Sequence, residues 1–529
     1  MKISIRSFSI TLFFLVYVIV GVSTYSDYGL SWDEPISRQN GGVNIKYIGE
    51  RFAPFLLTEN IKNYPNLNDW HDKDYGVAFE APLVALEQLF DLKDERDVFL
   101  FRHLMTFLFF SLGVLAVFGI ATMRFGDYRA GLLAAALIIL SPRFFAESFY
   151  NSKDIVFMAA FAIAMYTMLK FFANPNYRQS IIHGFVTAFA IDVRIMGVII
   201  LIGTLAVFAI KFLKNEISIP QGFKVVLLYL VATCLFVIAM FPWLWNDPIG
   251  NFILAFNNMA EFRWDNDILY MGEFIRSTNL PWHYIPVWIL ITTPPIYIGL
   301  LLMGCVVSLK QLVSRRYVLW SNDAEMIDLI ILGLFIIPIV TVITLDSVLY
   351  DGWRQLYFIY PALILIAVRG LKYVYACLSD YKIQRVMFTF LISLGLAYNT
   401  YWIWSAHPLQ NVYFNSFVGG DWRNKFELDY WGLGNRDALQ YILDHDHSQI
   451  INIAADSGTP LDRALMILKP EDRIRFNLSR DNAAPRYVLT NYRWVRNRDD
   501  SKYSTGYNLF YQKIVSGEII LSVYKRKGA

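Results

Sequence analysis

The sequence predicts a polytopic α-helical membrane protein that carries a small α/β domain at its C-terminal end. Hydrophobic residues make up 56% of the 529-residue chain and charged residues only 17%, whereas a typical soluble domain has about 25% charged residues. The apolar residues are gathered into blocks of about 20, a length that crosses a bilayer as a helix. After residue 404 these blocks end, and short helical and strand-like patterns alternate instead.

About eleven apolar segments are predicted to cross the membrane, and the fifth is the shortest. They lie at residues 7–25, 99–121, 130–145, 155–173, 180–192, 195–213, 223–243, 284–309, 326–345, 355–376 and 385–404. The first segment follows Lys2 and Arg6, as in a signal peptide, but no small-residue cleavage site comes after it. We therefore expect it to remain as a membrane anchor.

The lysine and arginine residues of the short loops predict the orientation of the chain. The flanks on one side are rich in them, as in the loop that holds Lys211, Lys214 and Lys224. The short loops on the other side hold only Arg143, Lys153, Arg194 and Arg354. The positive-inside rule therefore predicts a cytoplasmic N-terminus.

Three long segments are then expected outside, at residues 26–98, 244–283 and 405–529. In the first of them, Ala81 to Phe90 is amphipathic and is predicted to lie on the membrane surface as a helix. The last one shows helical patterns at 436–445 and 460–468 and strand-like runs at 450–453, 487–489 and 519–524. We therefore divide the chain into a transmembrane catalytic domain, residues 1–404, and an extracytoplasmic α/β domain, residues 405–529.

Charge and cysteine content exclude several classes of function. The net charge is +3 and the basic residues are spread along the chain, so no nucleic-acid partner is expected. The three cysteines, Cys234, Cys305 and Cys377, all fall in apolar segments. Their spacing suits neither a disulfide framework nor a metal site.

The stretch Ser31-Trp32-Asp33-Glu34-Pro35 places two adjacent carboxylates just beyond the first apolar segment. A carboxylate at the membrane surface can accept a proton from a hydroxyl group during catalysis. A solvated turn that ends at Pro35 would explain the same residues without any chemistry. Three later loops bring further charge to the same side of the membrane, which favours the catalytic interpretation.

The first of these loops lies between the third and fourth segments and carries two basic and two acidic side chains. They are Arg143, Glu147, Lys153 and Asp154. Charge inside a membrane segment costs about 2.5–3.5 kcal/mol, so its presence at a segment's edge requires a reason. The alternative is loop solubility with a pair between Lys153 and Asp154.

The second loop re-enters the membrane at Pro361 and surrounds an arginine with aromatic and acidic residues. These are Tyr350, Asp351, Trp353, Arg354 and Tyr357. A guanidinium group can bind a phosphate through two parallel hydrogen bonds. Interfacial anchoring of the aromatic residues is an equal alternative. Elsewhere, Asp192 and Arg194 are expected to pair with each other, the usual state of charge at that depth.

Four short motifs follow one another along the chain in an order that is typical of one family of membrane enzymes. They are Asp33-Glu34, Asn151-Ser152-Lys153-Asp154, Arg354-Gln355-Leu356-Tyr357 with Pro361, and the run from Val412 to Gly432. In this order and sidedness the sequence resembles the membrane-integral C-type glycosyltransferases, above all the protein O-mannosyltransferases and the lipid A aminoarabinose transferases. The Trp-Trp-Asp-Tyr-Gly signature of oligosaccharyltransferases is absent, so transfer to asparagine is not expected.

The resemblance implies transfer of a sugar, a hexose or a pentose, from a polyprenyl-phosphate carrier to an acceptor hydroxyl outside the membrane, usually with inversion. The acceptor would be a glycan, a lipid or a protein, and the membrane a bacterial inner membrane. Asp33 would be the base, with Glu34 and Asp154 as further catalytic candidates. Arg354, Lys153 and Arg143 would hold the phosphate. The remaining substrate-binding candidates are Glu147, Tyr350, Asp351, Trp353 and Tyr357. No metal-ligand set is evident, and assistance by a divalent cation is left open.

Two other classes of function remain as alternatives. A lipid or glycan transporter would carry charged residues through the middle of its spans, whereas here most charges lie at the outside ends. The absence of an inverted repeat also weighs against a secondary transporter. The third class is an assembly protein that acts through a binding surface on the C-terminal domain.

Overall fold

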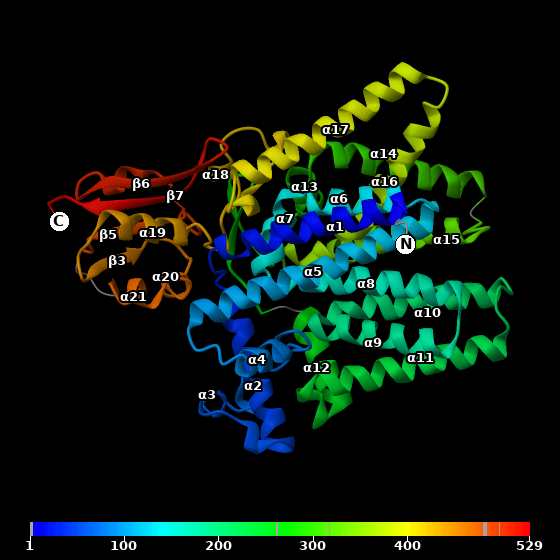
Figure 1. Ribbon diagram of the computed structural model, residues 1–529, viewed down its shortest axis with the longest axis horizontal. Helices are drawn as coiled ribbons and strands as arrows, with labels where there is room; N and C mark the ends of the chain where they lie inside the picture. Colours follow the sequence, from blue (N-terminus) through cyan, green and yellow to red (C-terminus); the bar gives the residue numbers. More distant parts are fainter. Residues whose placement is uncertain (1–3, 261–262, 317, 480–483, 497, 529) are drawn as a thin grey trace.

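The protein is a bundle of long apolar helices with a strand-containing C-terminal region at one end (Figure 1). It is described by a computed structural model that covers residues 4–260, 263–316, 318–479, 484–496 and 498–528. Two residues of the predicted outside segment 244–283, numbers 261 and 262, lie outside the described residues. Helices α2 and α4 lie toward the same end of the bundle as the C-terminal sheet.

Within the described residues, nine helices are long and apolar enough to cross a membrane. They contain α1 (Ile5–Thr24), α5 (Glu95–Phe125), α8 (Asp154–Ala173), α10 (Val198–Leu213), α11 (Ile219–Met240), α14 (Pro295–Ser314), α15 (Asp323–Thr344), α16 (Tyr360–Cys377) and α17 (Lys382–Ser405). Short 3-10 turns lengthen three of these spans, to Ile5–Asp27, Ile195–Leu213 and Arg354–Cys377. The prediction of a polytopic helical membrane protein is confirmed. The number of spans stays a prediction, because one bent pair of helices would make a tenth.

The bent pair is α6 (Tyr128–Ile139) and α7 (Pro142–Tyr150), which meet at 73°. Pro142 suits the first turn of a new helix but cannot continue the old one, so the predicted segment 130–145 is broken there. For the same reason the predicted segment 284–309 divides at prolines into α13 (Tyr284–Thr292) and α14. The short fifth segment lies within α9 (Tyr177–Val193), which has 17 residues and is not among the nine helices.

Helices α8 and α16 form the centre of the bundle. In each of these spans 83% of the most apolar stretch is buried, against 11% for α1 and 17% for α17. The largest hydrophobic core contains both central helices, continues beyond α17 to Leu433, and also includes Val515 and Ile520. Any polar group at the outer end of α8 is therefore held in a rigid, closely packed setting.

The first long segment folds back over the helix bundle through α2 (Glu34–Phe52), α3 (Glu59–Lys62) and α4 (Glu80–Leu89). The predicted amphipathic helix is therefore present as α4. Its apolar face is buried inside the protein at Leu83 and Val84, whereas Leu89 and Phe90 are exposed. The predicted position on the membrane surface therefore stays a prediction, and only for the exposed C-terminal end of this helix.

The second long segment holds α12 (Pro248–Ala260) and a hairpin of β1 (Asp267–Tyr270) and β2 (Glu273–Arg276). This hairpin was not predicted from the sequence. A bridge between Tyr270 and Phe426 links it to the segment that follows α17. The hairpin therefore connects the helix bundle to the C-terminal region.

The C-terminal region has one sheet in the order β4-β3-β5-β7-β6, with β3 parallel to its neighbours and β7 antiparallel to both of its own. The strands are β3 (Ile451–Ala455), β4 (Phe476–Leu478), β5 (Tyr487–Thr490), β6 (Tyr507–Val515) and β7 (Glu518–Arg526), and the helices are α19 (Asn435–His445), α20 (Leu461–Leu465) and α21 (Pro470–Arg473). The three predicted strands correspond to β3, β5 and β7. This region has a hydrophobic core of its own, which begins at Ala438.

Candidate active site

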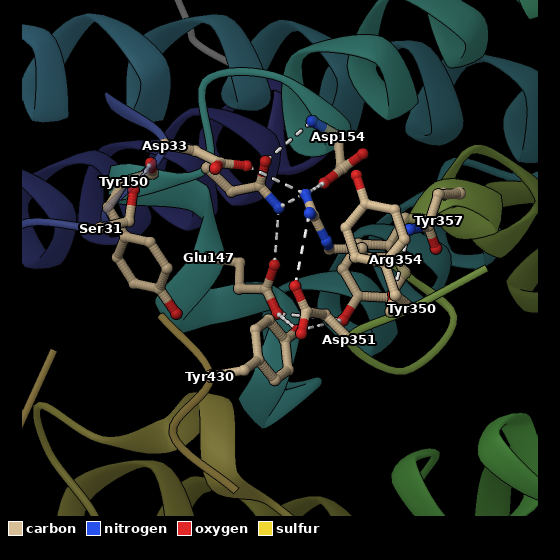
Figure 2. Close-up of polar contacts among 12 residues, drawn as sticks. Ser31, Asp33, Glu147, Tyr150, Asp154, Tyr350, Asp351, Arg354, Tyr357 and Tyr430 are labelled. Carbon is tan, nitrogen blue, oxygen red and sulfur yellow. Dashed lines mark hydrogen bonds and ion pairs between the residues drawn. The ribbon is translucent and has the colours of Figure 1, made fainter. Parts of the chain in front are cut away.

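Arg354 lies at the centre of a cluster of three carboxylates (Figure 2). Its Nη1 atom is 3.2 Å from Oδ2 of Asp33 and 3.1 Å from Oδ2 of Asp154. Its Nη2 atom is 3.4 Å from Oδ2 of Asp351. The three acids come from the start of α2, the start of α8 and the loop before α16, so the fold brings together segments that are far apart in the sequence.

Two aromatic rings fix the plane of the guanidinium group. The Cζ atom of Arg354 lies 4.8 Å from the ring centre of Tyr350 and 4.8 Å from that of Trp431. Cation–π contacts of this kind strengthen when the cation is desolvated, and Arg354 is only 3% exposed. The arginine predicted to bind phosphate is therefore held rigidly at the re-entry of the chain.

Asp33 is the acid that faces solvent. It precedes α2, and Pro35 stands in the first turn of that helix, yet the carboxylate does not cap the helix. The side chain turns instead to Arg354 and is 23% exposed. A carboxylate with this access can reach a substrate, whereas a fully buried one cannot.

Asp154 is fully buried and begins α8. Its Oδ1 atom pairs with Nη2 of Arg194, and its backbone N–H donates to Oδ1 of Asn151 at 2.8 Å. The predicted pair between Asp192 and Arg194 is therefore wrong. Asp192 turns away and accepts a hydrogen bond from the backbone of Ala78 at 2.6 Å, because Arg194 stands in extended backbone beyond the end of α9.

Asp351 is buried between two arginines. Besides Arg354 it binds Nη2 of Arg493 through Oδ1 at 2.9 Å. Burial raises the pKa of Asp351, and the positive charges of Arg493 and Arg354 oppose that shift. The residue stands at φ 55° and Gly352 follows at φ 76°, a left-handed turn that glycine accommodates readily.

Glu147 belongs to a second polar layer behind this cluster. Its Oε1 atom accepts hydrogen bonds from the hydroxyls of Tyr357 at 3.0 Å and Tyr430 at 3.2 Å. Its Oε2 atom accepts one from Asn151 at 2.7 Å, and the same amide donates to Asp154 at 3.3 Å. Glu147 thus supports Asp154 through Asn151 and is itself fully buried.

The other predicted site residues are divided between the cavity and its supporting structure. Lys153 lines the cavity, with its Nζ atom 4.2 Å from the ring centre of Tyr75. Glu34 points away from Arg354 and pairs with Nε2 of His103 at 2.9 Å. Trp353 donates to Thr292 at 2.9 Å.

Arg143 is also part of the supporting structure. It is 1% exposed and donates through Nη2 to the carbonyl oxygen of Tyr413 at 3.1 Å. Its guanidinium group lies over the rings of Phe414 and Trp288. The structure therefore does not bring Arg143 to the cavity wall with Lys153.

A cavity of about 530 Å³ joins the carboxylate cluster to an apolar passage. Its polar end is lined by Asp33, Asp74, Tyr75, Lys153, Arg194 and Arg354. Its apolar end is lined by residues of α10 and α15, among them Ile202, Gly203, Ile337 and Leu345. Ile202, Ile337 and Leu345 are also exposed on the outside of the bundle, so the apolar end reaches the lipid-facing surface.

Sequence reasoning missed several of these residues. Arg194 was assigned to a local pair, and Tyr75 lay in a loop without any recognisable motif. Tyr430 and Trp431 belong to the run after α17 on which the resemblance partly rests, but no role is predicted for either of them. Arg493 had no signal at all, because its partner Asp351 is 142 positions away.

Among the described residues there is no cluster of three or more histidine, cysteine, aspartate or glutamate side chains arranged to hold a metal ion. The three acids of the cluster are occupied by arginine side chains.

Comparison with known proteins supports the fold. Residues 89–245 match the family model described as dolichyl-phosphate-mannose-protein mannosyltransferase. The structure is similar to the crystal structure of ArnT from Cupriavidus metallidurans in the apo state, with 12% identity, 98% of each chain covered and a TM-score of 0.50. The chain has the fold of a C-type membrane glycosyltransferase.

The crystal structure of the same ArnT bound to undecaprenyl phosphate also matches, at 11% identity, with 98% of each chain covered and a TM-score of 0.48. No curated protein matches the sequence. The predicted resemblance to C-type glycosyltransferases is therefore confirmed by the fold and by the family match. The matched residues 89–245 include α7 and the start of α8, which supply Glu147, Lys153 and Asp154 to the site.

Proposed function

We propose that the protein is a glycosyltransferase that moves a sugar from a polyprenyl-phosphate carrier to an acceptor hydroxyl outside the membrane. The observation that carries this proposal is the cavity of about 530 Å³, in which a charged end meets an apolar end. Ligand sites of about 300–1,000 Å³ are typical of small-molecule binding. A carrier with an anionic phosphate and a hydrocarbon tail matches both ends at once.

The polar end supplies the cations for the phosphate. Lys153, Arg194 and Arg354 all line it, and arginine can bind phosphate oxygens through two hydrogen bonds. The isoprenoid tail would follow the apolar residues of α10 and α15 toward the lipid. Burial of apolar surface contributes about 25 cal/mol per Å², so the first isoprene units add to the affinity for the donor.

Asp33 is the proposed base. Its carboxylate accepts the proton of the acceptor hydroxyl while the acceptor oxygen bonds to the anomeric carbon. The bond between that carbon and the phosphate oxygen breaks, and the electron pair leaves with the polyprenyl phosphate. Attack opposite to the leaving group inverts the anomeric centre. The cations of the polar end stabilise the phosphate dianion that forms, a type of electrostatic stabilisation that enzymes commonly use.

The family match supports this donor class, since the family's description names dolichyl phosphate mannose. We propose a hexose or pentose as the transferred sugar and a glycan, lipid or protein hydroxyl as the acceptor. The protein is an integral membrane protein by its helices. A bacterial inner membrane, with the C-terminal region outside the cytoplasm, remains part of the proposal.

The test uses pure protein in detergent and a donor whose sugar is radiolabelled. Transfer of label to a hydroxyl acceptor, with release of polyprenyl phosphate, is the expected result. The Asp33→Asn variant is the matched control, because it keeps size and polarity but cannot act as a base. If the parent consumes none of a panel of hexose and pentose polyprenyl-phosphate donors, the proposal is overturned.

A further inference from the structure

Arg493 of the C-terminal region binds directly to the carboxylate cluster. It follows β5, in the region with the separate hydrophobic core, yet its Nη2 atom lies 2.9 Å from Oδ1 of Asp351. The side chains of both residues are almost fully buried, at 1% and 2% exposed. Removal of both charges from water costs free energy that their mutual attraction alone does not recover. Further contacts must therefore hold this pair in place.

The surroundings of Arg493 hold its guanidinium group in one place. The Cζ atom lies 4.4 Å from the ring centre of Trp32 and 4.5 Å from that of Trp494. Its Nη1 atom donates to the backbone carbonyl of Tyr430. Trp32 directly precedes Asp33, so Arg493 binds one acid of the cluster, Asp351, and contacts the chain neighbour of a second.

The backbone on either side of Arg493 is strained. Tyr492 has φ 63° and Trp494 has φ 61°, a left-handed conformation that residues other than glycine rarely adopt. Strain of this kind persists only where the surrounding structure fixes it, and it concentrates at functional sites. Two hydrogen bonds hold this loop in place. Gly458 N–H donates to the Arg493 carbonyl at 3.0 Å, and the side-chain amide of Asn491 donates to the Asp429 carbonyl at 2.9 Å.

We infer that Arg493 is a positioning residue for catalysis, which fixes Asp351 and through it orients Arg354 against Asp33 and Asp154. This inference rests on the proposed function. Asp351 binds Arg493 with one carboxylate oxygen and Arg354 with the other. A shift of Asp351 therefore moves the guanidinium group that faces the base and the donor phosphate. The C-terminal region would thus contribute to turnover although Arg493 touches neither substrate.

The test compares Arg493→Gln with the parent by steady-state kinetics in detergent. We expect kcat to fall about 10-fold or more, since small errors in the position of reacting groups are costly. The donor KM should stay within about threefold, because Lys153 and Arg194 still hold the phosphate. Arg493→Lys should recover part of the kcat, since it restores the charge without the planar fork.

Arg486→Gln is the matched control. Arg486 lies in the same region and binds Asp446 at 3.2 Å and Ser448 at 2.7 Å, both within that region. This variant should alter thermal stability but leave kcat at the parent value. It separates loss of stability in the C-terminal region from loss of positioning at the site.

A double-mutant cycle identifies the route of the effect. If Arg493 acts through Asp351, the variant with both Arg493→Gln and Asp351→Asn should lose no more kcat than the stronger single variant. Losses that multiply, or parental kcat in Arg493→Gln, would overturn the inference while leaving the glycosyltransferase proposal intact. Should Arg493→Gln fail to fold, parental kcat in Arg493→Lys overturns it equally. A parent without any transfer activity overturns both proposals.

Discussion

The guanidinium group of Arg354 lies 3.2 Å from the carboxylate of Asp33, across 321 positions of sequence. Asp33 is the exposed member of the pair, with 23% of its side chain accessible against 3% for Arg354. The arginine orients the carboxylate, and the cavity that Asp33 lines gives it access to a hydroxyl group. This pairing joins the proposed base to the proposed phosphate site.

Replacement of Asp33 by asparagine should abolish turnover. Asn has the size of Asp but accepts no proton at neutral pH, so kcat should fall at least about 10²-fold, the lower range for loss of a general base. Donor binding, measured by equilibrium dialysis, should stay near the parent value. Glu34→Gln is the control, because Glu34 faces His103 and should change thermal stability more than kcat. Turnover by Asp33→Asn within a few-fold of the parent would remove Asp33 as the base.

Replacement of Arg194 by glutamine should raise the donor KM by about 10-fold, the effect of losing about 1.4 kcal/mol of binding. Arg194 lines the cavity, and its charge would attract the phosphate. Arg143→Gln should instead lower the thermal midpoint, since Arg143 is buried against Tyr413. Equal KM changes in the two variants would contradict this assignment.

A larger side chain in the apolar passage should weaken the binding of the polyprenyl-phosphate donor. A side chain at Gly203 would meet no atom within 4 Å of its Cβ, so Gly203→Leu should fold and project into the cavity that Gly203 lines. We expect the KM for a polyprenyl-phosphate donor to rise about threefold to tenfold. Gly299→Leu, at an exposed helix position with equally open space, should behave like the parent. A parental KM in Gly203→Leu would exclude this passage as the tail site.

Acid should destabilise the C-terminal region through Asp446. Burial alone would raise the pKa of Asp446, but hydrogen bonds from Ser448 and Tyr487 and the charge of Arg486 lower it below its usual value. A depressed pKa gives stability that is present above the unfolded-state value of about 3.9 and is lost as the pH falls through the folded-state value. The thermal midpoint of the parent should therefore drop below about pH 4. Asp446→Asn should start lower and show a smaller drop, and an identical pH profile would refute this role.

The orientation can be tested with a reporter that is active only in the cytoplasm. Fused after Arg526, at the end of β7, it should be inactive if the C-terminal region lies outside. The same reporter placed in the predicted cytoplasmic loop after Lys214 should be active. Activity at Arg526 would reverse the membrane sides of the whole proposed site.

Adjacent charges at the ends of apolar segments made part of the site predictable. Asp33, Asp154 and Arg354 each stand where a helix or re-entrant turn begins. Charged side chains at such depth carry a free-energy cost, which marks these residues as candidates for function. The same logic misplaced Glu34, because neighbours in a helix start point in different directions. It misplaced Arg143 as well, whose partner Tyr413 lies 270 positions away.

Long-range partners account for most of what the sequence left undetermined. The end of α9 directs Arg194 to Asp154 rather than to Asp192, and no local pattern records that choice. Pro142 indicates in the sequence that a helix breaks there, but the 73° angle between α6 and α7 depends on how the two helices pack. Apolar length predicted the long helices, because the thickness of the bilayer sets the length of a helix that crosses it.

The passage lined by α10 and α15 also limits how much of a carrier molecule the protein can contact. About 530 Å³ is room for a drug-sized molecule, far less than a long polyprenyl chain fills. Ile202, Ile337 and Leu345 carry the passage out to the lipid-facing surface, so the far end of any such chain would lie among the acyl chains of the bilayer. The proposed enzyme would therefore contact only the phosphate and the first isoprene units of its carrier. Its affinity for the donor would not depend on the length of the remaining chain.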